Sequence, residues 1–370
     1  MPTLSGHTNS NLMSKNRTPA ITDITSEKSV KIKAIALILL MWHHLFGVNY
    51  IESWLSPIEG IDMVVGISAK VCLGIFLFCS GYGLYKSYIS KEKTDKLYVL
   101  KKIIQTLIPY WLIMLVAIAI LVYLGKFEPK YLPVSLFALI HDDDMLYVSF
   151  SWYIKLYILL MLILPLVRLI ERKWKKNIFL DLLIYVAVPF GIYYIFQGHM
   201  DEEHFKSIPQ FLVSSVLFLI FWFPLFAIGF IFAKYEIYKK VLKFTSRFPS
   251  ILVIVIAFLI CGYVIYMRFL FYYYCIADVI YAPLFITGCL LIMDNIRFKS
   301  RYVLPFIGKR SLSYWLLSGM FFLNTSELLV LITWPKIPVL ILLWTMLLLT
   351  PFVFAIDFVS GKILKLIFRK

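Results

Sequence analysis

Long apolar segments separated by short polar ones recur from residue 34 almost to the C-terminus. Most are close to the roughly 20 residues that a helix needs to cross a hydrocarbon core about 30 Å thick. We therefore predict an all-α integral membrane protein, a polytopic bundle of about ten transmembrane helices at residues 34–51, 63–85, 103–124, 150–167, 178–197, 211–233, 250–267, 271–293, 302–323 and 338–361. The stretch 131–141 is too short to cross and contains Pro133, so we expect at most a re-entrant segment there.

Residues 1–30 differ from the rest of the chain because they are rich in Ser, Thr and Asn and lack an apolar run. Such a composition predicts a disordered cytoplasmic tail. A signal peptide would need an apolar core followed by a cleavage site with small residues, which this segment lacks. We expect residues 31–370 to form one transmembrane domain.

Basic residues are concentrated in alternate connections between the predicted spans. Most of the 37 Lys and Arg residues lie in the two terminal segments and in four loops, at residues 86–102, 168–176, 234–247 and 297–310. Acidic residues cluster in the other loops, as in the triplet Asp142, Asp143 and Asp144. Because cytoplasmic loops are enriched in Lys and Arg, this alternation predicts that both termini are cytoplasmic.

The composition agrees with this interpretation. Only 16% of the residues are charged, compared with about 25% in soluble domains. The net charge of +16 would suit a nucleic-acid partner, but its confinement to alternate loops is explained by membrane topology, so we expect no nucleic acid. The five cysteines lie in apolar runs without metal-ligand spacing, and we interpret them as small buried residues.

The first predicted span contains two adjacent histidines, His43 and His44, and begins near Lys33. A helical rise of about 1.5 Å per residue places His44 roughly 16 Å above Lys33, near the middle of the membrane. Ionisable residues at that depth are costly and usually mark a pathway or a reaction centre. The alternative is a pair of neutral histidines hydrogen-bonded between packed helices. The pair and its depth favour a functional role.

Short motifs follow this histidine pair in a fixed order. They are Lys33 and His44 separated by ten residues, Gly74 to Tyr82, Pro109-Tyr110-Trp111, Ser151-Trp152-Tyr153, Phe226 to Gly229 with Lys234 after it, and Gly308 to Trp315. In this order and spacing, roughly residues 30 to 365 resemble the acyltransferase-3 family of bacterial membrane O-acyltransferases. Each motif alone is weak, and the resemblance rests on the whole set.

The resemblance implies an enzyme that transfers an acyl group, usually acetyl, from cytoplasmic acyl-CoA to a sugar hydroxyl. The acceptor would be a cell-surface or lipid-linked polysaccharide, such as O-antigen, capsule or exopolysaccharide. The setting would be the inner (plasma) membrane of a bacterial cell. The chain departs from the family pattern at three points. It has Lys33 where Arg is commoner, no acidic residue in Cys72-Leu73-Gly74, and no histidine in Leu317-Ser318-Gly319.

The candidate catalytic residues are His44, His43 and Ser80. A histidine suits the activation of a hydroxyl because its ordinary pKa of about 6.5 lies near the working pH. We expect His44 to be the base. His43 lies ~100° around the helix, and we favour a packing role for it. Ser80 would donate to a developing oxyanion, although a Ser-Gly pair more often serves helix packing.

For the acyl donor, acetyl-CoA, the candidates are Lys33, Tyr82, Lys101 and Lys102. CoA is polyanionic, and these residues lie toward the cytoplasmic ends of their predicted spans. Most of the basic residues will set topology alone, and Lys33 has the strongest claim because it lies at the base of the histidine helix. Tyr82 also fits an interfacial aromatic belt.

For the acceptor, the candidates are Trp152, Tyr153, Lys155 and Asp278. Aromatic faces and acidic groups commonly bind sugars, and Trp152, Tyr153 and the run from Phe271 to Tyr274 lie toward the predicted outer side. An intramembrane charge needs a partner, so we expect Asp278 to pair with Lys155 or to orient a histidine. His141, His199, His204 and the Asp142–Asp144 triplet belong to the outer loops, where solvated charge is the commoner explanation.

We expect no metal, because adjacent histidines diverge and no i,i+4 His/Glu pair accompanies them. The alternative function is a transporter or polymerase of polysaccharide or lipid-linked glycan without acyl transfer. That class explains the spans and the aromatic richness but not the spacing of Lys33 and His44. Acyl-CoA binding would separate the two classes. The acceptor sugar, the acyl group and the oligomeric state stay open, with membrane lipid as the one further expected partner.

Overall fold

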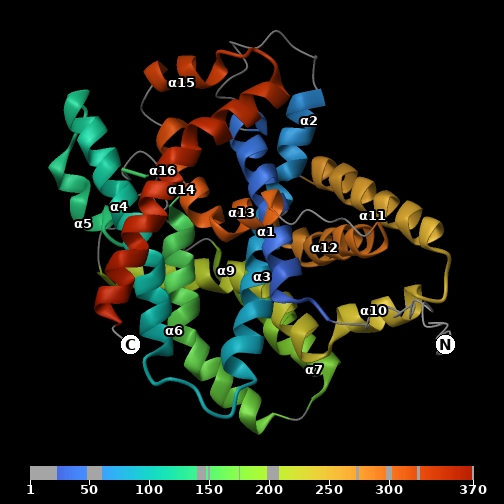
Figure 1. Ribbon diagram of the computed structural model, residues 1–370. Coiled ribbons are helices and arrows are strands. Elements are labelled where there is room, and N and C mark those ends of the chain that lie inside the picture. Colours follow the sequence, from blue (N-terminus) through green and yellow to red (C-terminus); the bar gives the residue numbers. More distant parts are fainter. Residues whose placement is uncertain are drawn as a thin grey trace, which may run out of the picture.

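The computed structural model describes residues 23–47, 61–139, 147–148, 151–174, 176–197, 208–271, 275–296, 302–322 and 326–368. All regular structure within these ranges is helical (Figure 1). The first half contains α1 Ser26–Trp42, η1 His43–Gly47, α2 Ile61–Ser68, η2 Ala69–Val71, α3 Cys72–Leu84, η3 Tyr85–Ile89, α4 Tyr98–Tyr123, η4 Pro129–Tyr131, α5 Leu132–Ser135 and α6 Trp152–Lys173.

The second half continues with α7 Ile178–Leu182, η6 Leu183–Ala187, α8 Val188–Phe196, α9 Ile208–Lys234, α10 Ile237–Thr245, α11 Ser250–Leu270, η8 Cys275–Ala277, α12 Asp278–Asn295, α13 Val303–Lys309, α14 Ser311–Phe322, α15 Ser326–Thr333 and α16 Pro338–Ile367. The segments η1, η3 and η6 are π-helical turns that continue an α-helix, whereas η2, η4 and η8 are 3₁₀ turns.

Within the described ranges, nine helical segments are long and apolar enough to cross a membrane. The predicted all-α polytopic membrane fold is confirmed. The predicted continuous span at 302–323 is wrong, because the chain breaks at Arg310 into α13 and α14. At about 1.5 Å per residue, neither half is long enough to cross alone. Arg310 instead pairs with Asp357 of α16, with a distance of 3.1 Å between Nε and Oδ2.

The centre of the bundle is the crossing of α3 and α9, where two glycines let the backbones touch. A Cβ atom at Gly81 would overlap the carbonyl oxygen of Phe226, and one at Gly229 would overlap that of Phe78. Small residues at such crossings allow the close approach on which membrane helix packing depends. Two of the sequence motifs, around Gly81 and Gly229, therefore have a packing role.

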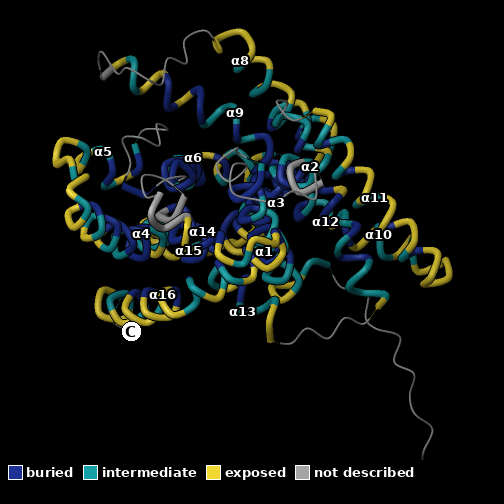
Figure 2. Tube along the Cα trace, turned by 90° about the horizontal axis from the view of Figure 1, so that it is seen from above, coloured by how far each residue is buried: buried dark blue, intermediate teal, exposed yellow. Residues whose placement is uncertain are grey.

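The helix that carries the histidines, α1, is enclosed by α3, α13 and α14. Gly308 of α13 lies against the carbonyl oxygen of Val30, where any side chain would overlap it. The outer helices α4, α11 and α16 have exposed outward sides (Figure 2), with apolar residues such as Leu259 and Leu347 more than 60% exposed. A membrane protein places such residues against lipid.

The first helix begins earlier than predicted. Thr25 caps α1 by accepting a hydrogen bond from the Lys28 amide at 3.2 Å. Residues 26–30, which we expected in the disordered tail, are therefore its first turns, and residues 1–22 of that tail lie outside the described residues. Capping of this kind satisfies amide groups that a helix start leaves without partners.

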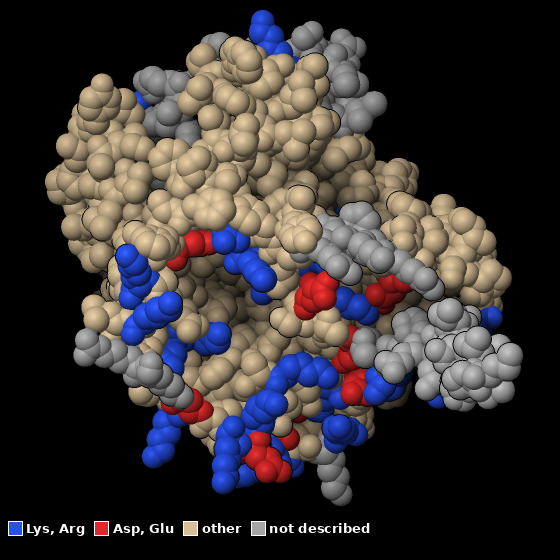
Figure 3. Space-filling view, in the orientation of Figure 1, with Lys and Arg blue, Asp and Glu red and all other residues tan. Residues whose placement is uncertain are grey.

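One further helix, α10, lies in the basic loop after α9 and is amphipathic. Tyr238 on its inner side is fully buried and donates to Asp294 at the end of α12, at 2.8 Å. Lys28 of α1 pairs with the same Asp294 oxygen at 2.8 Å. Lys and Arg side chains gather over the lower half of the molecule (Figure 3), which is the side that the loop charges predict to be cytoplasmic.

Candidate active site

The two histidines lie at the top of α1, where the helix widens into the π-helical turn η1. Both are buried, with 7% of His43 and 4% of His44 exposed, and their ring centroids are 5.9 Å apart. Turns of this kind occur often at functional sites. The structure therefore holds both predicted side chains inside the protein and not in the lipid.

His43 has a defined orientation. Its Nδ1 lies 2.8 Å from the carbonyl oxygen of Gly66 in α2. A carbonyl can only accept, so Nδ1 carries the hydrogen and the neutral ring keeps a lone pair on Nε2. Gly47 and Gly66 make this approach possible, because a Cβ at either would lie less than 3 Å from the other's backbone. This contact explains His43 as a residue that locks η1 against α2.

A buried ion pair lies beside this turn. Arg268 of α11 and Asp278 of α12 are at most 1% exposed, and Nε and Oδ1 are 3.0 Å apart. The charges of Arg268 and Lys70 lie close enough to act on the His43 ring. Gly74 leaves room for this pair, because its Cβ would lie 2.9 Å from that of Asp278.

The expected pairing of Asp278 with Lys155 is not what the structure shows. The ammonium of Lys155 lies over the rings of Phe211 and Phe218, 5.5 and 5.2 Å from their centroids. Asp278 pairs with Arg268, ten residues before it across the short connection between α11 and α12. The sequence shows Arg268 and Asp278 as charges in or near apolar segments, but it does not show which charges lie side by side in the folded protein.

Ser80 and Tyr153, predicted for different roles, are hydrogen-bonded to each other with 3.2 Å between their oxygens. The Ser80 hydroxyl donates to the carbonyl oxygen of Phe76 at 2.9 Å, so Tyr153 must be the donor to Ser80. Ser80 is half-buried although Cys79 and Gly81 beside it are buried. It therefore borders an accessible space, while its role as an oxyanion donor stays a prediction.

Trp315 of α14 completes this cluster. Its ring stacks on Phe76 with centroids 5.3 Å apart and contacts Tyr153 at 4.8 Å. Only 2% of Trp315 is exposed, and its Nε1–H has no acceptor among the residues that the structure describes. Leaving a buried donor without a partner costs about 1–3 kcal/mol. Trp315 ends the motif that begins at Gly308, but the sequence alone indicates no role for it.

Trp152 and Tyr153, the aromatic candidates for the acceptor, are both buried, and their role in binding a sugar stays a prediction. Trp152 is 7% exposed and stacks on Trp222 with centroids 5.1 Å apart. Tyr153 is hydrogen-bonded to Ser80 and so lies at the same depth in the membrane. Ser80 is nine residues before Ile89, the lower end of the span Val64–Ile89. Among the described residues, both rings therefore face protein and not solvent.

The predicted acyl-CoA residues lie at the lower end of the same region. Cys79, next to Ser80, is beside Ser29 and within reach of the Lys33 charge. The Lys33 charge also acts on Lys102 of α4, so the two cations lie close together. Lys101 forms an ion pair with Asp95.

Only 5% of Tyr82 is exposed, and the Lys86 ammonium lies 5.7 Å from the centroid of the Tyr82 ring. Tyr82 is therefore not an exposed residue of an interfacial aromatic belt. Lys86 also pairs with Asp23 just before α1, with Nζ and Oδ2 3.2 Å apart. Tyr82 therefore belongs to the contact between the end of α3 and the start of the described chain.

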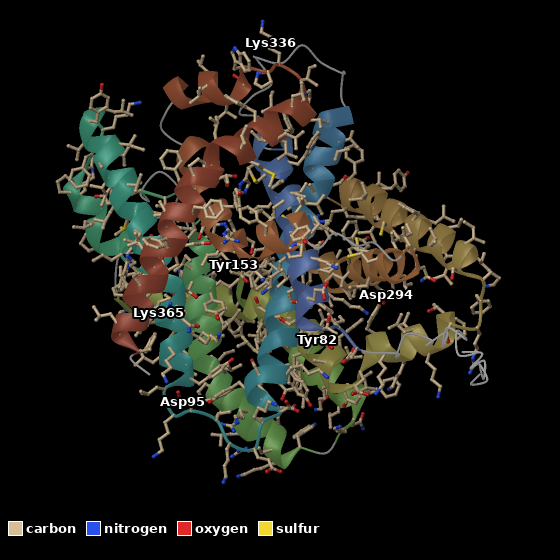
Figure 4. All side chains as sticks on the ribbon, in the orientation of Figure 1. Tyr82, Asp95, Tyr153, Asp294, Lys336 and Lys365 are labelled. Atoms are coloured by element: carbon tan, nitrogen blue, oxygen red, sulfur yellow. The ribbon has the colours of Figure 1, made fainter. Side chains whose placement is uncertain are left out.

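A hollow opens in this part of the molecule. In Figure 3 it lies in the lower half of the face and Lys and Arg side chains border it. Figure 4 shows Lys365 of α16 at one side of this area, and Tyr153 between α16 and the α1–α3 pair. In this orientation Tyr153, which is hydrogen-bonded to Ser80, is seen in the same part of the molecule as the hollow.

A second concavity runs along α13, α14 and α16. It is a groove of about 650 Å³ with walls formed by residues such as Val303, Phe306 and Leu347. Lys309 and Arg310 line it together with the hydroxyl residues Tyr314 and Thr350. Its lining combines apolar surface for a hydrocarbon chain with positive charge for an anionic group.

A buried charge network that sequence reasoning missed joins α6, α7 and α9. The Lys234 ammonium pairs with Glu171 at 2.8 Å and Asp181 at 2.7 Å. Tyr185 and Tyr235 donate to these two carboxylates, each at 2.8 Å. The available signal was Asp181, an acid inside the predicted span 178–197. The network fixes the lower ends of three helices.

Some predicted features lie outside the described residues. These are His141, the Asp142–Asp144 triplet, His199, His204 and Tyr272 to Tyr274. Within the described ranges, no group of three or more His, Cys, Asp or Glu side chains could hold a metal ion. The expected absence of a metal stays a prediction.

Comparison with known proteins adds one finding. The profile of the acyltransferase-3 family, described as an acyltransferase domain, matches residues 32–358, which is nearly the whole chain. No curated protein and no solved structure matches the chain. The matched region begins just before Lys33 and includes both histidines and Trp315. The chain therefore belongs to the acyltransferase-3 family and is a multi-pass membrane acyltransferase.

Proposed function

We propose that this protein transfers an acyl group, most simply acetyl, from cytoplasmic acyl-CoA to a hydroxyl of a cell-surface or lipid-linked polysaccharide. It would act in the inner membrane of a bacterial cell with both termini in the cytoplasm. The observation that carries the proposal is the buried histidine pair at the top of α1, the helix that has Lys33 about two turns above its first residue, Ser26.

In this reaction His44 is the general base. Its neutral ring accepts the proton of the acceptor hydroxyl as the hydroxyl oxygen attacks the thioester carbonyl carbon. The new C–O bond forms, the C–S bond breaks, and the leaving CoA thiolate takes the proton from the imidazolium. The buried site keeps water, the competing nucleophile, away from the thioester.

The phosphates of the donor bind at the cationic lower end. Two ammonium groups held close together, as in Lys33 and Lys102, repel each other and so favour an anion between them. His44 lies roughly 16 Å above Lys33 along the helix. An extended pantetheine arm covers such a distance and carries the thioester from the cation-lined opening toward the histidines.

A lipid-linked acceptor is supported by the groove along α13, α14 and α16. Its apolar walls suit a hydrocarbon chain, and Lys309 suits a phosphate, whereas Arg310 is paired with Asp357. A glycan transporter or polymerase would need no acyl-CoA, and no residue of the described structure favours that function over acyl transfer.

The test compares surface glycan from cells that carry the parent protein or His44→Ala. We expect a ~42 Da increment on the glycan to fall at least about 100-fold, the scale of a lost general base. A thermal unfolding curve of the purified variant controls for folding. Undiminished acylation in a folded His44→Ala variant would remove this histidine from the reaction. A parent protein that shows no acyl-CoA binding would remove the function itself.

A further inference from the structure

Three sequence motifs that the proposed reaction leaves unused meet at one place. Phe76 and Ser80 come from the motif in α3, Tyr153 from the motif at the start of α6, and Trp315 from the motif in α14. The three helices are brought together here by the stacked rings and by the hydrogen bond between Ser80 and Tyr153. Their convergence indicates a shared role at this position.

The hydrogen bonds within the cluster leave one donor over. The proton of Ser80 goes to the Phe76 carbonyl, and that of Tyr153 goes to Ser80. Only 2% of Trp315 is exposed, and its Nε1–H has no acceptor in the described structure. Contacts with Phe76 and Tyr153 hold the indole ring in place, so this donor is fixed before any ligand arrives.

The position of the cluster identifies the ligand. Cys79, one residue before Ser80, lies within reach of the Lys33 charge, and Phe76 is one helical turn farther up α3. Cys79 is also hydrogen-bonded to Ser29, one turn below Lys33 on α1, so the cluster lies beside Lys33 and below His44. Tyr157, one turn below Tyr153, is hydrogen-bonded to Thr106, one turn above Lys102, so the cluster lies above the Lys102 side of the proposed phosphate site. Half-buried Ser80 and the hollow in Figure 3 indicate that this level is accessible. The part of acyl-CoA that would pass here is the pantetheine arm, which carries amide carbonyl oxygens.

We propose that the Trp315 Nε1–H donates a hydrogen bond to a carbonyl oxygen of the pantetheine arm of acyl-CoA. This inference rests on the proposed function, since it assumes that acyl-CoA enters from the side of Lys33. Tyr153 and Phe76 act as positioning residues that hold the indole. The contact is made far from the reacting carbon, so it contributes to binding of the donor equally in the ground and transition states.

The test uses Trp315→Phe, which keeps an aromatic ring between Phe76 and Tyr153 but removes the N–H. Calorimetry measures the affinity of the purified protein for CoA and for the adenosine bisphosphate fragment of CoA, which lacks the arm. We expect CoA to bind about tenfold more weakly to the variant, the effect of one hydrogen bond. Binding of the fragment stays unchanged, and kcat stays within about twofold while KM rises.

Trp222→Phe is the matched control, because Trp222 is also a buried, stacked tryptophan but lies against Trp152. It should leave both affinities unchanged. Equal CoA affinity in Trp315→Phe and the parent would overturn the inference, as would equal weakening for CoA and the fragment. A parent protein that binds neither ligand would instead refute the proposed function.

Thermal unfolding shows whether Trp315→Phe is folded. If it is not, replacing the Trp315 indole by benzothiophene, which has sulfur in place of the N–H and nearly the same shape, gives the same comparison. The affinity of that variant for CoA, divided by its affinity for the adenosine bisphosphate fragment, is compared with the same ratio for the parent protein. Retained tight binding of CoA by that variant contradicts the donor role.

Discussion

His43 and His44 occupy one turn but have different surroundings. His43 donates through Nδ1 to Gly66, which fixes its ring against α2, while His44 lies deeper, with 4% of its surface exposed. If His43 only locks this turn, an amide that reproduces its donor should replace it. If His43 is itself the base, the same replacement removes the lone pair on Nε2 and abolishes the reaction.

We therefore predict that His43→Asn, whose amide N–H can reach the Gly66 carbonyl, retains at least about a third of the acylation rate. His44→Asn, in contrast, should lose about 100-fold or more, because an amide cannot accept the proton. The measurement is transfer of radiolabelled acetyl from acetyl-CoA in isolated membranes, normalised to folded protein. The reverse order of the two variants would assign the base to His43.

At the scale of elements, the crossing of α3 and α9 sets the position of the aromatic cluster, because Phe76 and Ser80 lie on the same helix as Gly81. Substituting Ala at Gly81 forces a methyl group into the Phe226 carbonyl, a backbone atom that cannot swing aside. Gly83, two residues along the same helix, has nothing within 4 Å of its Cβ position. The chain thus provides its own control.

We predict that Gly81→Ala destabilises the protein by about 1–3 kcal/mol, the usual cost of overpacking. Gly83→Ala should be neutral or stabilise by up to about 1 kcal/mol, because alanine favours the helix. Unfolding midpoints of the two purified variants in the same detergent give the comparison. Equal midpoints would mean that α3 and α9 are not in contact through these glycines.

The elements also show where prediction from sequence ends. Hydropathy is a local property, so the spans of α4, α6, α9 and α16 were predictable to within about six residues at each end. The break at Arg310 was not, because it depends on Asp357, 47 residues later, and on Gly308 against Val30. The candidate histidines followed from depth and spacing alone. Their neighbours did not, because pairs such as Ser80 with Tyr153 or Arg268 with Asp278 are tertiary contacts.

At the scale of the whole molecule, the distribution of charge defines its two sides. Helix α16 contains 30 residues, and at about 1.5 Å per residue it is longer than the hydrocarbon core. Its two ends must therefore lie on opposite sides of the membrane. Lys336 precedes its first residue and Lys365 lies in its last turns, at the top and in the lower half of Figure 4.

These two lysines allow a direct test of the side from which the acyl donor enters. We predict that Lys336→Cys reacts with a membrane-impermeant maleimide on intact cells, whereas Lys365→Cys reacts only after the inner membrane is opened. The five native cysteines are first replaced, so that each variant has a single thiol. Lys101, next to Lys102, lies 5.8 Å from the ring centroid of Phe368, just after α16. Lys365 therefore lies at the same end of the molecule as Lys102, and the result bears on more than topology. Labelling of Lys365→Cys from outside would turn the cation-lined opening away from cytoplasmic CoA and would contradict the proposed path of the thioester.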